Sequence, residues 1–312
     1  MIAALMILVL LVLAAAYYCF HTAFYAPRGK ALPEGDFDLP EGEIYEPYRD
    51  KLIGWVRQAR AMPREEMTIT AFDGTPLHGW FYEYAPGAPM EIMFHGYRGS
   101  AERDMGGGVQ RCFRLGRSAL IVDQRCSGKS GGNVITFGIR EHRDCLSWAW
   151  HCARHFGPDR KIILTGISMG AATVMMAANK DLPPNVIGIL ADCGYTSPRA
   201  IMEEVIRKDM HLPPRLCWPF VKLGARLFGG FDPEEDSPLE SLKGAKVPVI
   251  FFHGEADDFV PCDMSRENFE ACVSRKRLVT VPDAGHGLCF PKDSGAYCQA
   301  LADFFGPEAS HS

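Results

Sequence analysis

The amino-acid sequence predicts an α/β fold in which a mostly parallel sheet of eight strands is covered by helices on both faces. The first observation is a series of short, apolar, β-branched runs without alternation, which is typical of strands buried on both faces. The second is that helical patterns separate these runs, as the crossovers between parallel strands require. The third is an antiparallel hairpin pattern ahead of the series.

The chain opens with an apolar segment that we expect to be a membrane anchor over residues 1–25. Residues 1–20 (MIAALMILVLLVLAAAYYCF) carry no charged side chain and have the length of a membrane-spanning helix. Tyr17, Tyr18 and Tyr25 fit an interfacial belt. A cleaved signal peptide is the alternative, but it normally begins with a basic region, and nothing basic precedes this apolar run.

The residues after the anchor predict its orientation and a linker. The nearest basic residues all follow the anchor, at Arg28, Lys30, Arg49 and Lys51. By the positive-inside rule, the body of the protein is then expected on the cytoplasmic side of the membrane. Residues 26–50 are rich in proline, glycine and acidic residues and are expected to form a tether. The rest, residues 51–312, is expected to form one domain.

The strands and helices of this domain follow from hydrophobic patterning. Residues 67–72 and 77–84 alternate in part and flank the turn dipeptide Asp73-Gly74, which predicts a hairpin. Six buried strands are predicted after it, at 91–94, 119–122, 161–165, 186–191, 248–252 and 278–281. Apolar side chains recur at spacings of three and four over 139–156, which predicts a helix, and a second helix is predicted over about 293–305.

Composition and charge narrow the class of function. The 312 residues are 47% hydrophobic and 23% charged, which is enough apolar material for a sizeable core. A net charge of -5 with no lysine- and arginine-rich run gives no electrostatic basis for binding nucleic acid. The eleven cysteines include no CxxC pair, so we expect buried thiols and no metal site.

Ser168 is the candidate nucleophile. It lies in Gly166-Ile167-Ser168-Met169-Gly170, where a predicted strand gives way to a predicted helix. A sharp strand-to-helix turn strains the serine backbone and holds its hydroxyl outward, and side chains at the two glycine positions would collide with neighbouring elements. The same five letters also arise by chance in glycine-bearing loops, and the strand before and helix after are what favour catalysis.

A serine hydroxyl needs a base and a carboxylate to become a nucleophile. His286, in a glycine-flanked loop after the last predicted strand, is the candidate base. The carboxylate is expected between the serine and the histidine along the chain. The residues alone leave four candidates open, namely Glu255, Asp257 and Asp258 after the strand at 248–252, and Asp192 at the end of an earlier strand.

Two backbone N–H groups are expected to bind the oxyanion of the tetrahedral intermediate. One belongs to Met169, the residue after the nucleophile, and the other comes from the loop after the third strand, where Tyr97 is the candidate. His95 in the same loop is expected to be a structural hydrogen-bonding group rather than a base.

Five motifs in register, HGYRG, DQRCSGKS, GISMGA, HGEADDFVP and AGHG, are similar to those of the α/β-hydrolase superfamily. The likeness is greatest to bacterial serine hydrolases related to serine aminopeptidases and lysophospholipase-like esterases, and it covers about residues 65–306. The resemblance implies an α/β-hydrolase fold and a triad of Ser168, Asp257 and His286. It also implies that Asp123 and Arg125 hold the loop after the fourth strand, although Cys126 stands where the family usually has glycine.

The resemblance further implies a small helical cap, inserted at about residues 195–245. Within it, residues 212–231 combine aromatic, aliphatic and basic side chains. Such a stretch is able to line an acyl pocket or touch a membrane surface, but ordinary packing onto the domain is the expectation that we favour.

The sequence therefore predicts a serine hydrolase that cleaves carboxylic (acyl) esters through a Ser-His-Asp triad and an acyl-enzyme, with no cofactor. The expected substrate is a small-molecule or lipid-like ester, and the expected partner is the membrane, through the N-terminal helix. A peptidase or amidase with the same triad is the alternative within enzymes. A catalytically silent, lipid-binding relative is the alternative from another class.

Overall fold

An eight-stranded sheet organises the protein, with the strand order β1-β2-β4-β3-β5-β6-β7-β8. The computed structural model describes residues 1–27, 37, 39 and 42–306. β2 is antiparallel to both β1 and β4, and every other neighbouring pair is parallel. The predicted fold class is confirmed. The strands are β1 (Glu65–Thr70), β2 (Pro76–Tyr82), β3 (Met90–Phe94), β4 (Ser118–Asp123), β5 (Ile162–Ile167), β6 (Val186–Asp192), β7 (Val249–Gly254) and β8 (Lys276–Val281).

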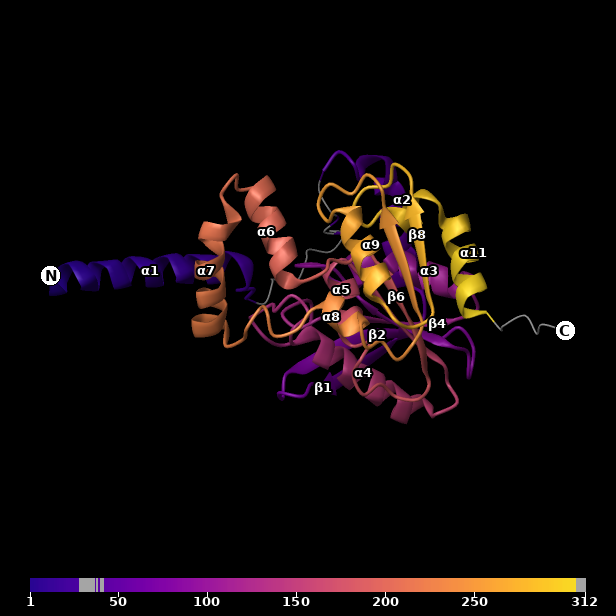
Figure 1. Cartoon of the computed structure of the whole chain (residues 1–312). Coiled ribbons are helices and arrows are strands. Elements are labelled where there is room, and N and C mark those ends of the chain that lie inside the picture. The colour runs from indigo at the N-terminus through magenta and orange to yellow at the C-terminus, as the bar shows by residue number, and fades with distance from the viewer. Residues whose placement is uncertain (28–36, 38, 40–41, 307–312) are drawn as a thin grey trace.

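Helices connect and cover these strands (Figure 1). The α-helices are α1 (Ile2–Ala23), α2 (Arg49–Ala61), α3 (Ala101–Arg114), α4 (Glu141–Phe156), α5 (Met169–Met176), α6 (Pro198–Lys208), α7 (Pro214–Gly224), α8 (Pro238–Leu242), α9 (Cys262–Ala271), α10 (Cys289–Lys292) and α11 (Ser294–Phe305). A 3₁₀ turn, η1 (Glu46–Tyr48), precedes α2, and a π-helical turn, η2 (Ala225–Gly229), continues α7.

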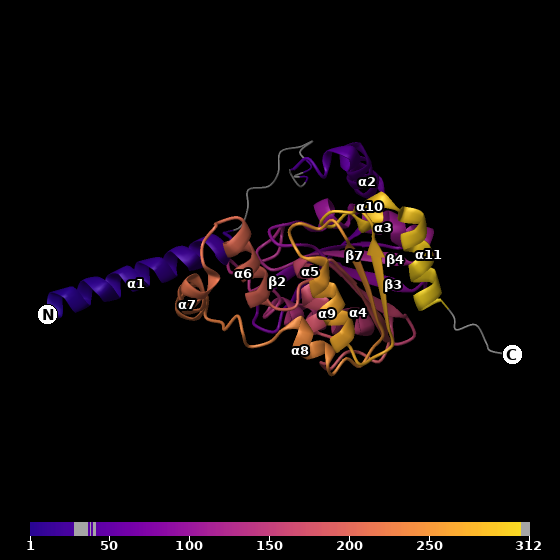
Figure 2. The same cartoon turned by 45° about the horizontal axis from the view of Figure 1, so that its top comes forward.

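The two faces of the sheet carry separate cores, because successive side chains of a strand point to opposite faces. Ile92 and Leu164 pack with the helices α4, α5 and α8. On the other face, Met93 and Ile121 pack with α2 and α3, and Ile250 packs with α10 and α11. Figure 2 shows α4, α8 and α9 on one side of the strands and α2, α3 and α11 on the other. Apolar runs without alternation follow from this burial on both faces.

The end of the predicted linker has helical structure. Helical structure begins at Glu46, inside the predicted linker 26–50, and the side chain of Tyr45 just before it contacts the domain. Most of the remaining linker, together with Arg28, Lys30 and the last six residues of the predicted domain, lies outside the described residues. The composition of this region predicts irregular structure, but its end forms a helical turn and contacts the domain through Tyr45.

The helix α1 projects from the body, while its C-terminal part lies beside α7 (Figures 1 and 2). By length and composition, it is the one helix of the described chain able to cross a membrane. Its approach to α7 is close, because a Cβ atom added at Gly224 would lie only 2.2 Å from the carbonyl oxygen of Ala16. Phe20 and Phe24 of this segment are buried against residues of α6 and α7.

Candidate active site

Ser168 lies between the last residue of β5 and the first residue of α5, as expected. Its backbone has φ 56° and ψ -116°, a conformation that side-chain-bearing residues rarely adopt. Its N–H donates to the carbonyl oxygen of Asp192 at 2.8 Å, which ties the turn to the end of the neighbouring strand β6. The strained turn carries the hydroxyl out of the sheet at the carboxyl end of the parallel strands.

Gly166 and Gly170 are required because a larger residue would not fit at either position. A Cβ atom at Gly166 would lie 2.0 Å from the carbonyl oxygen of Gly170. A Cβ atom at Gly170 would lie 1.9 Å from the carbonyl oxygen of Phe94, at the end of β3. Both contacts are with backbone atoms, which have little freedom to move away. The expected collision of side chains at these two positions is confirmed.

His286 joins Ser168 to Asp257 through two hydrogen bonds. Its Nε2 lies 3.0 Å from the Ser168 Oγ, and its Nδ1 lies 2.8 Å from the Asp257 Oδ2. Because a carboxylate only accepts, Nδ1 carries the proton and Nε2 is left to accept from the hydroxyl. His286 stands in the loop after β8, and the hydroxyl of Tyr45 donates to its main-chain oxygen at 3.1 Å.

The second oxygen of Asp257 is held by the loop in which it stands. Its Oδ1 accepts from the N–H groups of Phe259 at 3.0 Å and Val260 at 2.8 Å. The buried His253 Nε2 also lies 3.2 Å from the Asp257 Oδ2. Burial alone would raise the pKa of Asp257, but the hydrogen bonds from His253 and His286 outweigh it and bring the pKa well below its usual value. Asp257 therefore remains an anion beside the imidazole.

The other acids that the residues left open have different surroundings. Glu255 is exposed and accepts a hydrogen bond from the Thr280 hydroxyl at 2.7 Å. Asp258 is exposed as well. Asp192 is buried and accepts from the Tyr297 hydroxyl at 2.9 Å. Of the four acids, Asp257 is the one with a carboxylate hydrogen-bonded to His286.

The loop after β3 approaches the nucleophile. A Cβ atom at Gly96 would lie 3.6 Å from the Ser168 Cβ, and the next residue is Tyr97, while Met169 opens α5. The Gly96 N–H donates to the Asp104 carboxylate at 2.9 Å, which fixes the loop against α3. Asp104 is a positioning residue that the sequence motifs did not single out.

His95 is buried and forms two hydrogen bonds to the backbone. Its Nδ1 donates to the carbonyl oxygen of Gly96 at 2.7 Å, and its Nε2 accepts from the Gln124 N–H at 3.0 Å. Burial lowers the pKa of His95, so it stays neutral. These contacts agree with the structural role expected for this histidine.

Asp123 and Arg125 hold the loop after β4. The Asp123 carboxylate accepts from the N–H groups of Ala101 and Lys129, and Arg125 forms a bidentate pair with Asp144 at 2.6 Å. Cys126 has φ 70°, the left-handed region that favours glycine. The loop thus keeps the backbone that a glycine would adopt, although this chain has a cysteine there.

Two cavities meet at Ser168. The larger, of about 550 Å³, is walled by apolar side chains of α1, α6 and α7, and Ser168 and Met169 line it. The smaller, of about 190 Å³, lies on the His286 side, and Tyr45, Arg103 and Asp104 are among its lining residues. The contribution of α1 to the larger cavity was missed, because nothing in its apolar sequence distinguishes one helix face from another.

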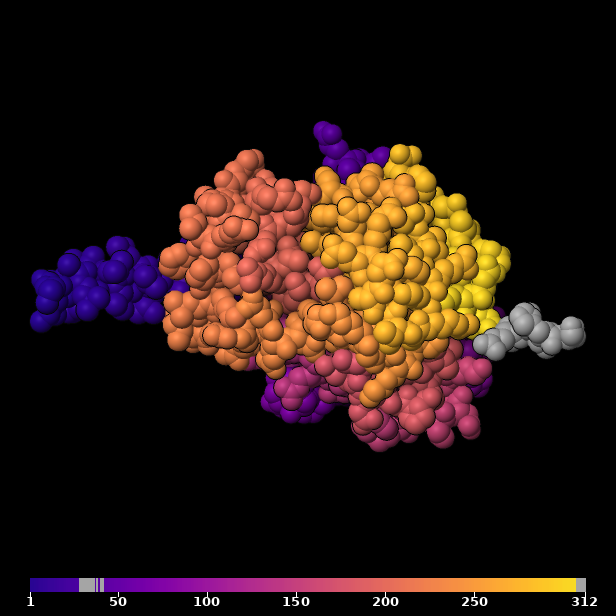
Figure 3. Space-filling view, viewed as in Figure 1, coloured from indigo at the N-terminus to yellow at the C-terminus, as the bar shows by residue number. Residues whose placement is uncertain are grey.

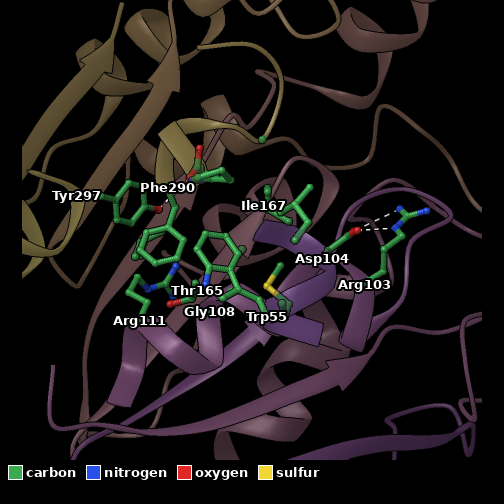
Figure 4. Close-up of a pocket in the computed structure, with 17 residues that line it drawn as sticks. Trp55, Arg103, Asp104, Gly108, Arg111, Thr165, Ile167, Phe290 and Tyr297 are labelled. Atoms are coloured by element: carbon green, nitrogen blue, oxygen red, sulfur yellow. Dashed lines mark hydrogen bonds and ion pairs between the residues drawn. The ribbon is translucent and has the colours of Figure 1, made fainter. Parts of the chain in front are cut away.

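A third, small cavity of about 60 Å³ lies beneath the site, between the sheet and α3 (Figure 4). Arg111 and Tyr297 point into it, together with Trp55 and Phe290. The same Arg111 pairs at 2.6 Å with the buried Glu91 at the start of β3. No local pattern predicts this ionic group, since Glu91 is the one charged residue of an otherwise apolar strand.

One cluster in the described residues has donors close enough for a metal ion. The Cys193 Sγ, an Asp257 oxygen and a His286 nitrogen lie within 4.8 Å of one another. Burial raises the pKa of the Cys193 thiol well above its ordinary value, so it stays protonated and ligates poorly. Both ring nitrogens of His286 already have partners in Asp257 and Ser168. The cluster therefore fits proton transfer better than metal binding.

Comparisons with known proteins identify the fold. No family model matches the chain. The uncharacterized protein YqkD of Bacillus subtilis is 27% identical over 61% of this chain, and the match spans 62% of YqkD, somewhat less than two thirds. The structure of the Pyrococcus furiosus esterase Pf2001 matches with a TM-score of 0.66 and 20% identity, over 90% of this chain and 97% of that one.

A peptidase shares the same fold. The puromycin-hydrolyzing peptidase of Mycobacterium tuberculosis matches with a TM-score of 0.60 and 17% identity, over 80% of this chain and 39% of that one. The strand order, the strained serine turn after β5 and the loops after β7 and β8 agree with these likenesses. The chain has the α/β-hydrolase fold.

Proposed function

We propose that this chain is a serine hydrolase that cleaves carboxylic (acyl) esters, with Ser168, His286 and Asp257 as its catalytic triad. One observation carries the proposal. A continuous chain of hydrogen bonds, 3.0 Å and 2.8 Å long, links an ionised carboxylate to the hydroxyl of Ser168, which lines an apolar cavity. This is the arrangement that turns a weakly nucleophilic hydroxyl into an attacking group.

The mechanism follows from the positions of these atoms. His286 Nε2 takes the proton as the Ser168 Oγ attacks the ester carbonyl, and Asp257 stabilises the imidazolium that forms. The N–H groups of Tyr97 and Met169 stabilise the negative oxygen of the tetrahedral intermediate. His286 then protonates the departing alcohol. Water, activated by the same histidine, attacks the acyl-enzyme and releases the carboxylic acid.

The two cavities at Ser168 support an ester with unlike halves. The larger cavity has almost entirely apolar walls and suits an acyl chain, since burying methylene groups is favourable by about 0.8 kcal/mol each. The smaller one is lined by Tyr45, Arg103 and Asp104 together with apolar side chains such as Leu52 and Leu288, and its volume suits a small alcohol. A peptidase or amidase remains the alternative, because the same fold and triad serve both reactions.

We further propose a membrane location for the whole chain. The apolar helix α1 is the single-pass anchor, and the catalytic domain lies on the cytoplasmic side. Arg28 and Lys30, which follow the helix closely in the sequence, support this orientation. All eleven cysteines lie in the described residues as free thiols, which agrees with a reducing compartment.

Paired ester and amide substrates test the reaction class. The full-length chain in detergent micelles is assayed with p-nitrophenyl butyrate and with the matched p-nitroanilide. We expect ester hydrolysis to dominate, and Ser168→Ala to abolish both hydrolysis and labelling by a fluorophosphonate probe. Faster cleavage of the anilide would establish the peptidase or amidase alternative. Absence of both hydrolysis and labelling in the wild type would favour a catalytically silent, lipid-binding protein.

Neighbouring acids provide the control for the triad. Asp257→Asn keeps the size of the side chain but removes the charge that holds His286 in its tautomer, so kcat should fall by roughly 10³- to 10⁴-fold. Asp258→Asn, one residue further along in the same loop, should change kcat less than twofold. Equal effects of the two substitutions on kcat would show that Asp257 does not belong to the triad.

A further inference from the structure

The N-terminal helix forms one wall of the cavity that leads to Ser168. The side chains of α1 that line this cavity are Ala15, Tyr18, Cys19, Thr22 and Ala23. Facing them are Met202 and Val205 of α6 and Val221 of α7. The cavity measures about 550 Å³, within the range of sites that enclose a whole small molecule.

We propose that α1 has two roles, as the membrane segment and as part of the acyl-binding site, so that the substrates are long-chain acyl esters drawn from the bilayer along α1. This inference rests on the proposed ester hydrolase. It adds the substrate class and the route of entry, and it makes the N-terminal segment a retained part of the enzyme rather than a leader.

The cavity runs along the helix from the reacting serine toward the membrane. The C-terminal end of α1 is fixed beside the site, because the Tyr97 hydroxyl donates to the carbonyl oxygen of Ala23 at 2.8 Å. Ala15, which also lines the cavity, stands eight residues earlier, about 12 Å away at 1.5 Å per residue. An acyl chain esterified at Ser168 would therefore lie beside α1, with its end toward Ala15.

The length of the exposed part of α1 brings the far end of the cavity to the bilayer. Residues 2–14 extend about 20 Å beyond the cavity, which is less than the hydrocarbon core of about 30 Å. Figure 3 shows this part of the helix standing clear of the body, next to the α6–α7 region. A helix that spans the core must therefore draw the adjoining surface into the membrane.

That adjoining surface is apolar enough to enter the membrane interface. The exposed apolar side chains around α6, α7 and η2 are those of Met210, Leu212, Leu216, Leu227 and Phe228. Two of them, Met210 and Leu212, also line the cavity. A lipid ester thus has a continuous apolar path from the bilayer into the cavity, along which its ester group reaches Ser168 while its chain end stays toward Ala15.

The packing of α1 argues that the helix stays attached. Gly224 of α7 accommodates the backbone of Ala16, and Phe20 and Phe24 are buried. The ring centroids of Tyr17 and Phe228 lie 5.2 Å apart, edge to face. Cleavage after this segment would expose these partners and open one side of the cavity to water.

Two adjacent alanines test the proposal with the same substitution. Ala15 lines the cavity, while its neighbour Ala14 is exposed and does not line it. The full-length wild type, Ala15→Trp and Ala14→Trp are assayed in detergent micelles with p-nitrophenyl palmitate and p-nitrophenyl butyrate. The indole at position 15 should lower kcat/KM for the palmitate ester relative to kcat/KM for the butyrate ester by tenfold or more. Ala14→Trp should keep the wild-type ratio, and equal effects of both substitutions would overturn the proposal.

A readout without catalysis separates this inference from the proposed reaction. Palmitic acid with a photoreactive diazirine at the end of its chain is added to phosphatidylcholine vesicles that contain the full-length protein. Cross-links should appear on α6 in the wild type and in Ala14→Trp, and should be lost in Ala15→Trp. Ester hydrolysis without these cross-links would refute the acyl cavity alone. Cross-links without hydrolysis would refute the proposed reaction and leave the cavity standing.

Discussion

The hydroxyl of Tyr97 donates a hydrogen bond of 2.8 Å to the main-chain oxygen of Ala23. The adjacent Arg98 donates from its guanidinium group to the carbonyl oxygens of Thr22 at 2.9 Å and Tyr25 at 3.1 Å. The last carbonyl groups of a helix lack partners within the helix, and a cation at that end is favoured by the helix dipole. The loop proposed to bind the oxyanion therefore also caps the N-terminal helix.

Tyr97→Phe should loosen the end of α1 while preserving the ring at this position. Loss of one hydrogen bond costs about 1 kcal/mol, so the amides of Phe24 and Tyr25 should exchange with solvent roughly fivefold faster. Hydrogen exchange followed by mass spectrometry measures this. Tyr17→Phe, an exposed tyrosine of the same helix, is the control and should leave these rates unchanged. Unchanged exchange in Tyr97→Phe would mean that packing alone holds the helix end.

Gly170→Ala should abolish activity and strongly destabilise the fold. The added methyl group would overlap the Phe94 carbonyl oxygen, only 1.9 Å away, and neither backbone has room to retreat. A loss of 3 kcal/mol or more in the free energy of unfolding is expected, on the order of the larger core overpacking effects. Urea unfolding, followed by circular dichroism, measures it.

A glycine in open surroundings provides the control for this substitution. Gly54, within the helix α2, has no atom within 4 Å of its added Cβ. Gly54→Ala should stabilise the protein by about 0.5–1 kcal/mol, because alanine loses less conformational entropy in a helix. If both substitutions had the same sign, the steric account of the serine turn would be wrong.

Glu91→Gln should destabilise the protein, most strongly at neutral pH. Glu91 is fully buried and pairs with Arg111 at 2.6 Å and Arg117 at 2.7 Å. Burial alone would raise its pKa, but the two guanidinium groups lower the pKa to about 2. Removing the carboxylate charge leaves two largely buried cations without their counterion, a loss of about 3–5 kcal/mol. Glu65→Gln, at an exposed glutamate, should change the free energy of unfolding by less than about 0.5 kcal/mol.

The difference in the free energy of unfolding between the wild type and Glu91→Gln should change with pH in a defined direction. The carboxylate has a lower pKa in the folded chain, at about 2, than the ordinary value of about 4.3 in the unfolded chain. Its contribution to stability is therefore complete above about pH 4.3 and is lost as the pH falls toward 2. The free energies of unfolding of wild type and Glu91→Gln should converge over this window. A difference that grows on acidification would contradict the assigned ionisation.

Cys126→Gly should be close to neutral for stability and for activity. Glycine relieves the left-handed backbone at φ 70°, which costs an ordinary residue about 1–2 kcal/mol. The same change removes a buried side chain that packs in the core around α6 and α7, and the lost burial is of similar size. Cys126→Val, whose β-branched side chain tolerates this region worst, should lower the midpoint of thermal unfolding by several degrees. A stable valine variant would show that the loop adopts another backbone.

Local sequence patterns predicted the strands, the N-terminal helix, two helices of the domain and the position of Ser168. Strand runs such as 161–165, the hairpin turn at Asp73-Gly74 and the helix at 139–156 are encoded by local patterns of burial and turn residues. The glycines at 166 and 170 are likewise local, since the turn that requires them is five residues long. Such features depend on residues that are close together in the chain, and they can therefore be predicted from the sequence alone.

Which distant groups meet depends on how the whole chain packs. The residues alone left four acids as candidates for the carboxylate of the triad, and only the family resemblance favoured Asp257. In the structure, the loops after β7 and β8 place the Asp257 carboxylate 2.8 Å from His286. The ionic group around Glu91 and the place of α1 in the wall of the cavity had no local signal at all. Contacts of this kind depend on how chain segments far apart in sequence pack against one another, and an apolar helix has the same sequence pattern whether it faces lipid, protein or substrate.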